Sequence, residues 1–244
     1  MKKYLFIGFL FSFFILKATQ NKDYDSLFDK ANQFQQQNQF QEALKLYQEI
    51  ENSSAIPSQS VFYNKGNCYY HLKEWGYARA YFEKALKLAP TDEQTLINLN
   101  LTLKEIEGSS YKKIDSIDHP LQLFTQHTWL LVALLFTVLI CFSFLLFKIS
   151  TNPKIKTFFL MTFIIIGIFL AFSLIGYSSY FFEEKEAVII SKSEVYENPV
   201  EKSTKIKILN SGQKVWVLEK IENWIQIKQG ENTFWIKSNH LIEI

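Results

Sequence analysis

Two long apolar runs near the middle of the chain constrain its fold more than any other feature. They cover residues 129–147 and 158–177, and neither contains an Asp, Glu, Lys or Arg. About 20 helical residues, each rising roughly 1.5 Å, cross a hydrocarbon core of roughly 30 Å. Lipid offers the backbone no hydrogen-bond partners, so each run is expected to form a helix. The pair predicts a transmembrane hairpin with spans at residues 128–148 and 157–180, joined by a loop at 149–156.

The charges around the hairpin predict its orientation. The loop region carries Lys148, Lys154 and Lys156 and no acidic residue, whereas the sequence Glu-Glu-Lys-Glu at residues 183–186 follows the second run. Positively charged loops tend to stay in the cytoplasm. A hairpin with its loop inside places both flanking parts of the chain outside. The expected location is therefore a bacterial inner (cytoplasmic) membrane, crossed twice, with the soluble domains on the periplasmic side.

Residues 1–20 predict a secretory signal peptide. Lys2 and Lys3 precede an apolar core at residues 4–16, which is too short to span a membrane comfortably. The cleavage region is imperfect, because Ala18 and Thr19 are its only small residues. An uncleaved anchor therefore stays open as the alternative. Either outcome exports the residues that follow, in agreement with the charge of the loop.

Residues 21–107 are expected to be helical, and small and aromatic residues recur in them at a fixed period. Small residues let two helices approach closely, and aromatic residues fill the space beside them. One set lies at the spacing typical of the tetratricopeptide repeat and consists of Phe62, Gly66, Tyr69, Ala78, Phe82, Ala85 and Pro90. A second set precedes it by one repeat and consists of Leu27, Ala31, Phe34, Ala43, Tyr47 and Ile50. The region therefore resembles a pair of tetratricopeptide repeats, although Lys65 stands where Leu is usual.

A further helix is expected from Asp92, which is a good N-cap residue. Its residues Leu96, Leu99 and Leu103 form one apolar stripe. The sequence offers this helix no partner, so it is interpreted as a capping helix. Residues 108–127 are interpreted as a linker that leads to the first span.

The inner face of such a helical stack predicts a peptide-binding groove. An asparagine amide both donates and accepts hydrogen bonds, which suits an extended peptide backbone or a terminal carboxylate. The candidate residues are polar side chains expected on the first helix of each hairpin, namely Asn32, Tyr63, Asn64, Asn67, Tyr70, Asn98 and Lys104. A polar face that is merely solvated is the alternative.

Residues 185–244 change to short segments in which apolar and polar residues alternate, as is typical of β-strands. The expected strands are residues 187–190, 205–209, 214–218, 224–228 and 233–236. Short strands of this number predict a small closed barrel. The segments 195–199, 209–212, 215–217, 223–225, 234–236 and 240–242 resemble the bacterial SH3-like domain, with Phe234 where that domain usually has Gly.

Tyr196, Trp216, Trp224 and Trp235 are candidates for an aromatic ligand groove in this domain. The alternative is that at least two of them pack in the core. Large aromatic side chains supply much of the buried area in so small a domain, so core packing is favoured.

Composition and spacing argue against several classes of function. The formal net charge is +2, which gives no reason to expect a nucleic-acid partner. The four histidines are scattered, Cys68 and Cys141 lie in different parts of the chain, and no glycine-rich phosphate loop occurs. We therefore expect no catalytic residues, no metal site and no cofactor, and hence a protein that is not an enzyme.

The fold class is multidomain. The parts follow one another as a signal peptide, all-α tetratricopeptide hairpins, a two-helix transmembrane hairpin and a small all-β SH3-like barrel. This order resembles the BatE-like membrane proteins of the Bacteroides aerotolerance (Bat) operon. The resemblance implies partners among other membrane proteins, including von Willebrand factor A-domain Bat proteins, and a role linked to oxidative or envelope stress.

Two functions are compatible with these features. The first is a non-enzymatic scaffold, anchored in the lipid bilayer, that mediates protein–protein interactions at the periplasmic face of the inner membrane. The alternative is binding or sensing of the cell wall, with peptidoglycan as the ligand of the SH3-like domain.

Overall fold

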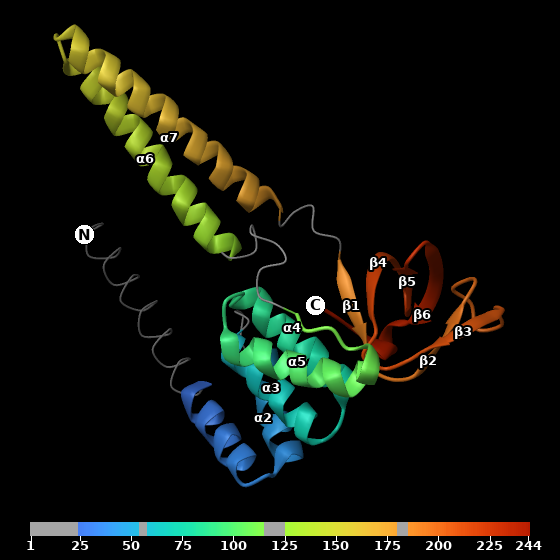
Figure 1. Ribbon diagram of the computed structural model, residues 1–244. Helices are drawn as coiled ribbons and strands as arrows, with labels where there is room; N and C mark the ends of the chain where they lie inside the picture. Colours follow the sequence, from blue (N-terminus) through green and yellow to red (C-terminus); the bar gives the residue numbers. More distant parts are fainter. Residues whose placement is uncertain (1–23, 54–57, 115–124, 180–184) are drawn as a thin grey trace, which may run out of the picture.

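The structure is a computed structural model that describes residues 24–53, 58–114, 125–179 and 185–244. Figure 1 shows three parts in chain order: a stack of short helices, a hairpin of two long helices and a β-sheet. The predicted signal peptide at residues 1–20 lies outside the described residues.

The first part is helical, as the sequence predicted. Its helices are residues 24–36, α2 (Phe40–Ser53), α3 (Gln59–His71), α4 (Trp75–Leu88) and α5 (Glu93–Glu107). Each helix from α2 to α5 packs against the next. Ser58 and Asp92 cap α3 and α5, since each side chain accepts a hydrogen bond from a backbone N–H of the first turn.

Small residues bring these helices close together. Ala31, Ala43 and Ala78 are fully buried. A Cβ atom on Gly66 would lie 2.6 Å from the ring of Phe82. A larger residue in place of Gly66 would therefore push α3 away from α4.

The last helix, α5, packs against a segment that no sequence pattern predicts. After α5 the chain forms a short 3-10 helix, η1 (Gly108–Ser110), and residues 111–114 then lie back against α5. Asn100 holds this segment, because its Oδ1 accepts hydrogen bonds from the Tyr111 hydroxyl at 2.7 Å and the Ile114 backbone N–H at 2.8 Å. Both residues also pack against the buried cluster between α4 and α5. The start of the predicted linker therefore belongs to the helical part.

The second part is a hairpin of α6 (Gln126–Ile149) and α7 (Pro153–Ser179), which begin slightly before the predicted spans. Both helices are long and apolar enough to cross a membrane and are mostly exposed, which is consistent with two membrane spans. Inside the hairpin the Ser143 and Thr162 hydroxyl oxygens are 3.0 Å apart. A Cβ atom on Gly176 would come within 2.5 Å of Trp129, so the missing side chain lets the open end of the hairpin close.

The third part is an antiparallel sheet, and the prediction of a closed barrel is wrong. The strands are β1 (Glu186–Ile189), β2 (Ser193–Tyr196), β3 (Lys205–Leu209), β4 (Lys214–Ile221), β5 (Trp224–Gln229), β6 (Asn232–Lys237) and β7 (Leu241–Glu243), in the spatial order β3-β2-β6-β5-β4-β1-β7. The terminal strands β3 and β7 each pair with one neighbour, so the sheet has two ends. The predicted segments became β1, β3, β4, β5 and β6. The short strands β2 and β7 were missed, because four and three residues show too little alternation.

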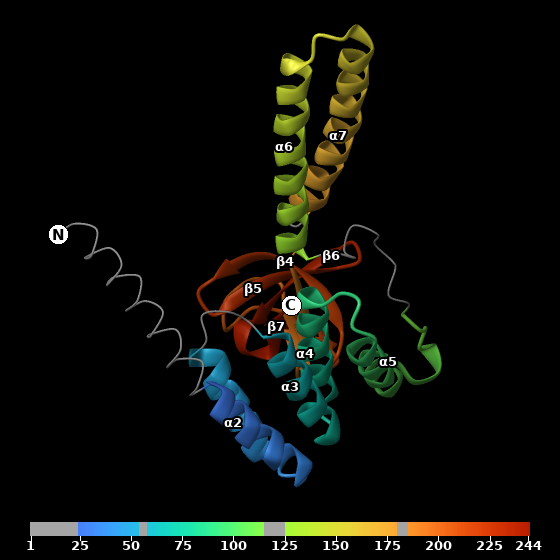
Figure 2. The same cartoon turned by 90° about the vertical axis from the view of Figure 1, so that its left-hand side faces the viewer.

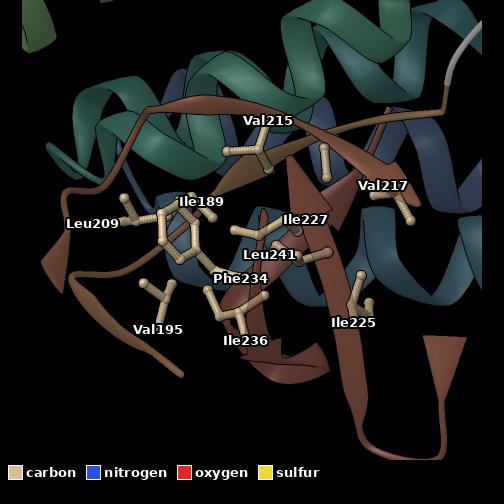
Figure 3. Packing of buried hydrophobic residues seen from close by; sticks show 11 residues of the cluster. Ile189, Val195, Leu209, Val215, Val217, Ile225, Ile227, Phe234, Ile236 and Leu241 are labelled. Carbon is tan, nitrogen blue, oxygen red and sulfur yellow. The ribbon is translucent and has the colours of Figure 1, made fainter. Parts of the chain in front are cut away.

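The sheet nevertheless curls around one apolar core, shown in Figure 3. Leu209 from β3 and Leu241 from β7, at opposite ends of the strand order, belong to the same buried cluster. Alternation in the sequence reports which side chains face the core. It does not indicate whether the outer strands pair, so a curled open sheet and a closed barrel have the same sequence pattern.

The sheet docks onto the helical part through α4, which contacts β1 and β7. A Cβ atom on Gly76 would lie 2.7 Å from the backbone oxygen of Ile189, so only glycine fits this contact. Ile242 packs against a buried cluster between α3 and α4. The chain before α6 and the chain after α7 therefore lie on the same side of the hairpin (Figure 1).

Candidate functional site

The predicted groove asparagines form two hydrogen-bonded pairs across neighbouring helices. Asn64 Nδ2 on α3 donates to Asn32 Oδ1 on the helix at residues 24–36, at 2.9 Å. Asn98 Nδ2 on α5 donates to Asn67 Oδ1 on α3, at 2.7 Å. These four residues, the amide ladder, join three helices side by side. All four are partly exposed, so their amides keep hydrogen-bonding capacity toward solvent.

A buried tyrosine supports one end of the amide ladder. The Tyr47 hydroxyl on α2 donates to Asn32 Oδ1 at 2.6 Å. Burial raises the pKa of Tyr47 above its ordinary value, so the hydroxyl keeps its proton and acts as a donor. Because Asn32 Oδ1 accepts from both Tyr47 and Asn64, its amide orientation is fixed.

Among the other predicted groove residues, Tyr63 contacts the amide ladder. The Tyr63 hydroxyl accepts a hydrogen bond from Asn98 Nδ2 at 3.2 Å and so lies next to the amide ladder. The ring of Tyr70 packs edge-on against Trp75, with centroids 5.1 Å apart. Lys104 has an exposed side chain near the end of α5.

Two apolar residues on α5 were not among the predicted groove residues. Ile97 and Leu101 are 51% and 45% exposed, one helical turn apart, and Leu101 lies one turn beyond Asn98. Leu99 and Leu103 of the predicted stripe are buried instead. The sequence held a signal for this surface, because α5 carries more large aliphatic residues than one buried stripe uses.

Lys65 lies in the interior of the helical part, fully buried. Its Nζ donates to Gln48 Oε1 at 2.8 Å, pairs with the Glu51 carboxylate and lies 4.2 Å from the centre of the Tyr81 ring. Burial lowers the pKa of Lys65 below its ordinary value, and Glu51 offsets this only in part. The buried cation thus connects α3 with partners on α2 and α4.

The four aromatic candidates of the sheet lie in different environments. Tyr196 pairs with Trp235 across β2 and β6, and its ring meets Trp224 edge-on with centroids 5.2 Å apart. Trp224 and Trp235 are 7% and 8% exposed, whereas Trp216 on β4 is 37% exposed. The aliphatic core cluster contains none of these four side chains. Two of the four are therefore packed, and Trp216 is the most open.

A charged cluster joins α4 to the sheet. Glu83 accepts a hydrogen bond from Arg79 Nε at 2.8 Å and pairs with Lys214 at 2.8 Å. Arg79 Nη1 donates to the backbone oxygen of Gly212 at 2.8 Å, and Lys214 also pairs with Glu186 at 2.7 Å. Burial alone would raise the pKa of Glu83, but Arg79 and Lys214 outweigh it and hold this pKa below its ordinary value. Arg79 and Gly212 are 133 positions apart, so no local sequence pattern predicts this cluster.

Cys68, Ser191 and His240 have structural roles. Burial raises the pKa of the Cys68 thiol to about 12, which keeps it protonated and unreactive. Ser191 Oγ lies 2.9 Å from His240 Nδ1, a contact that ties the β1–β2 turn to the 3-10 helix η3 (Ser238–His240). Within the described residues, no group of three or more His, Cys, Asp and Glu side chains is placed to hold a metal ion.

Residues 60–92, which cover nearly all of α3 and α4, match the family model of the tetratricopeptide repeat. Searches of curated proteins and of solved structures returned no match. The chain therefore contains a tetratricopeptide repeat region, and such repeats generally mediate protein–protein interaction. The amide ladder lies partly on this repeat, through Asn64 and Asn67.

Proposed function

We propose that this chain is a non-enzymatic scaffold, anchored in a bacterial cytoplasmic membrane, that holds a partner protein in its helical groove. The amide ladder of Asn32, Asn64, Asn67 and Asn98 carries the proposal. It offers a row of partly exposed donors and acceptors on a tetratricopeptide repeat region. Such a row suits the backbone of an extended peptide segment.

The surroundings of the amide ladder narrow the partner's chemistry. Ile97 and Leu101 present exposed apolar surface beside Asn98, and Lys104 adds a positive charge one turn further along α5. A segment that combines an apolar side chain with a nearby carboxylate complements this end of the groove.

The hairpin and the order of the parts support a proposed setting for the scaffold. The three lysines near the α6–α7 loop favour a cytoplasmic loop, with the helical part and the sheet at the periplasmic face. The order of the parts supports a Bat-type complex with von Willebrand factor A-domain membrane proteins and a link to oxidative or envelope stress. The C-terminal sheet, docked on α4, would then be an SH3-like module of that complex.

Photo-crosslinking in cells tests the groove. A photoreactive amino acid replaces Leu101 in the groove. In a control protein the same photoreactive amino acid replaces Leu88, an exposed leucine on α4. We expect a protein adduct at position 101 that disappears when Asn64→Ala and Asn67→Ala are added. An equal adduct at position 88, or an adduct at 101 that survives both substitutions, would remove the groove from the proposal. Asn232→Ala, at an exposed position of the sheet, is the control for a general effect of losing an amide.

Peptidoglycan binding by the sheet is the weaker candidate. Trp224 and Trp235 are almost fully buried, which leaves Trp216 and Tyr196 as the accessible aromatic side chains. Sedimentation of the detergent-solubilised full chain with purified peptidoglycan tests this binding. The Trp216→Ala variant tests whether binding depends on the accessible tryptophan. Co-sedimentation that depends on Trp216 would favour this function over the scaffold.

A further inference from the structure

Exposed apolar side chains form a row on β4. Trp216, Leu218 and Ile221 are 37%, 51% and 41% exposed. Val215 and Val217, which alternate with the start of this row, point into the aliphatic core. Trp216 and Leu218 therefore lie on the outer face of the sheet. Ile221 lies on the same face, because the register with β5 shifts between Val217 and Glu219 and pairs Ile221 with Trp224. Contiguous exposed apolar side chains of this kind are a candidate interaction surface.

The strand pairing places this row close to the end of the second span. The Val217 backbone N–H donates to the Lys185 backbone oxygen at 2.6 Å, and Trp216 is paired with Glu186 on β1. Only a few residues separate Lys185 from Ser179, where α7 ends. Fully extended, they reach at most about 22 Å. The row is thus tethered within a short distance of the place where α7 leaves the hairpin.

The direction of β4 places the end of the row closer to the end of α7. Because β4 is antiparallel to β1, it runs toward the N-terminal end of β1, which is the end connected to α7. Residues 218–221 continue past Val217 in that direction for roughly 13 Å. Figures 1 and 2 both show β4 on the part of the sheet that faces the hairpin.

We infer that Trp216, Leu218 and Ile221 rest in the headgroup and upper acyl region of the same bilayer that the hairpin crosses. Tryptophan concentrates at this depth, because its ring is apolar and its N–H is a hydrogen-bond donor. The inference rests on the membrane anchor of the proposed function. It adds a second point of contact with the membrane, which fixes the tilt of the docked sheet and helices and so the direction in which the amide ladder faces.

The charges near the row indicate whether the contact requires anionic lipid headgroups. Lys220 pairs with Glu243, and Lys214 pairs with Glu186 and Glu83. These two lysines are therefore not surplus charges for anionic headgroups. Lys228, which pairs with Trp216 across β4 and β5, and the exposed Glu219 on β4 carry opposite charges beside the row, so they add no net positive charge to it. Contact with the bilayer is apolar, and a zwitterionic lipid is sufficient for it.

The experiment measures the depth of a nitroxide label on the full chain in nanodiscs of phosphatidylcholine. The label is placed at Leu218→Cys and, for comparison, at Ile208→Cys; these positions are 51% and 54% exposed, and β3 lies at the end of the sheet away from the β4–β1–β7 edge. Cys141→Ala removes the exposed native thiol, whereas Cys68 is buried and does not react.

We expect the label at position 218 to collide with a water-soluble nickel chelate about fivefold less often than the label at 208, and with oxygen more often. Adding phosphatidylglycerol should leave this difference unchanged. Equal accessibility at the two positions, whether both are high or both are low, overturns the inference, and so does a difference that requires anionic lipid.

A separate measurement distinguishes failure of this inference from failure of the anchor. Membranes that contain the full chain are washed with alkaline carbonate. Release of the chain would refute the membrane anchor, and the inference with it. Retention of the chain together with a water-accessible label at position 218 would refute the inference alone.

Discussion

The interior of the helical repeats and the core of the sheet are built from different chemistry. The buried cluster of the sheet consists of aliphatic residues and one phenylalanine. The helical part instead buries Lys65, Thr95, Asn100 and Thr102 among its apolar residues. Both regions are well packed, so the difference lies in how directional their interactions are.

The sheet core is specified mainly by its pattern of apolar residues, whereas the helical interior also depends on individual polar contacts. Apolar packing has no preferred direction, so a sheet core accepts many side chains of similar volume. A buried polar group must find a partner with the right geometry. In the helical part such groups determine which segments meet, as when Asn100 recruits residues 111–114 to α5. Substitutions in each region test this contrast.

Ile227→Ala should cause the largest loss. Ile227 is fully buried in the core of the sheet, so the substitution removes apolar contact and leaves a cavity that costs about 3 to 4 kcal/mol. Hydrogen exchange of β5 and β6 in the detergent-solubilised full chain measures this loss. Ile227→Leu, which conserves volume, should cost less than about 1.5 kcal/mol. A leucine variant as unstable as the alanine variant would show that the sheet core is as directional as the helical interior.

Glu83→Ala tests the boundary where the two kinds of interior meet. The substitution leaves Arg79 and Lys214 without their shared buried carboxylate, which should cost about 3 kcal/mol. Faster hydrogen exchange is expected in both α4 and β1, because the cluster joins them. Glu201→Ala is the matched control, since it breaks a surface pair with Lys237 and should leave both segments unchanged. Protection lost in α4 alone would mean that the charged cluster does not hold the sheet in place.

Elements that depend on periodicity were predictable from the sequence, whereas long-range polar contacts were not. The helices, the apolar hairpin and five of the strands follow from period and composition. The amide ladder was found in part, because the asparagines recur at the repeat spacing. The segment at residues 111–114 shows no periodicity that distinguishes it from a linker. The contact of Arg79 with Gly212 depends on the docking of two regions, which no local pattern encodes.

Asn100→Ala should release the segment that covers α5. The substitution removes the acceptor of the Tyr111 hydroxyl and leaves the Ile114 N–H without its partner, at a cost of about 2 kcal/mol. Limited proteolysis should then cut at residues 111–114 in the variant and not in the wild type. Tyr111→Phe removes one hydrogen bond and keeps the ring, so it should cost about 1 kcal/mol. Unchanged proteolysis in Asn100→Ala would show that apolar packing of Tyr111 and Ile114 holds the segment without directional contacts.

Lys65→Met should have the smallest effect, and its sign is informative. A buried ion pair often contributes little, because the cost of burying the charge offsets the attraction, so methionine is expected to stabilise the helical part by about 1 kcal/mol. The folded pKa of Lys65 lies below its ordinary value of 10.5. Between those two values the unfolded chain binds a proton that the folded chain lacks, so this contribution makes stability rise with pH.

The advantage of Lys65→Met should therefore be greatest near neutral pH and shrink as the pH rises toward 10.5. The raised pKa of Cys68 acts in the opposite direction, but this thiol is present in both proteins and its contribution cancels in the difference. Hydrogen exchange of α3 in the two proteins across this pH range measures that difference. A loss of stability in Lys65→Met at neutral pH would show that Gln48, Glu51 and Tyr81 over-compensate the buried charge. The helical interior would then depend on this cation, in contrast to the sheet, whose core holds no charge.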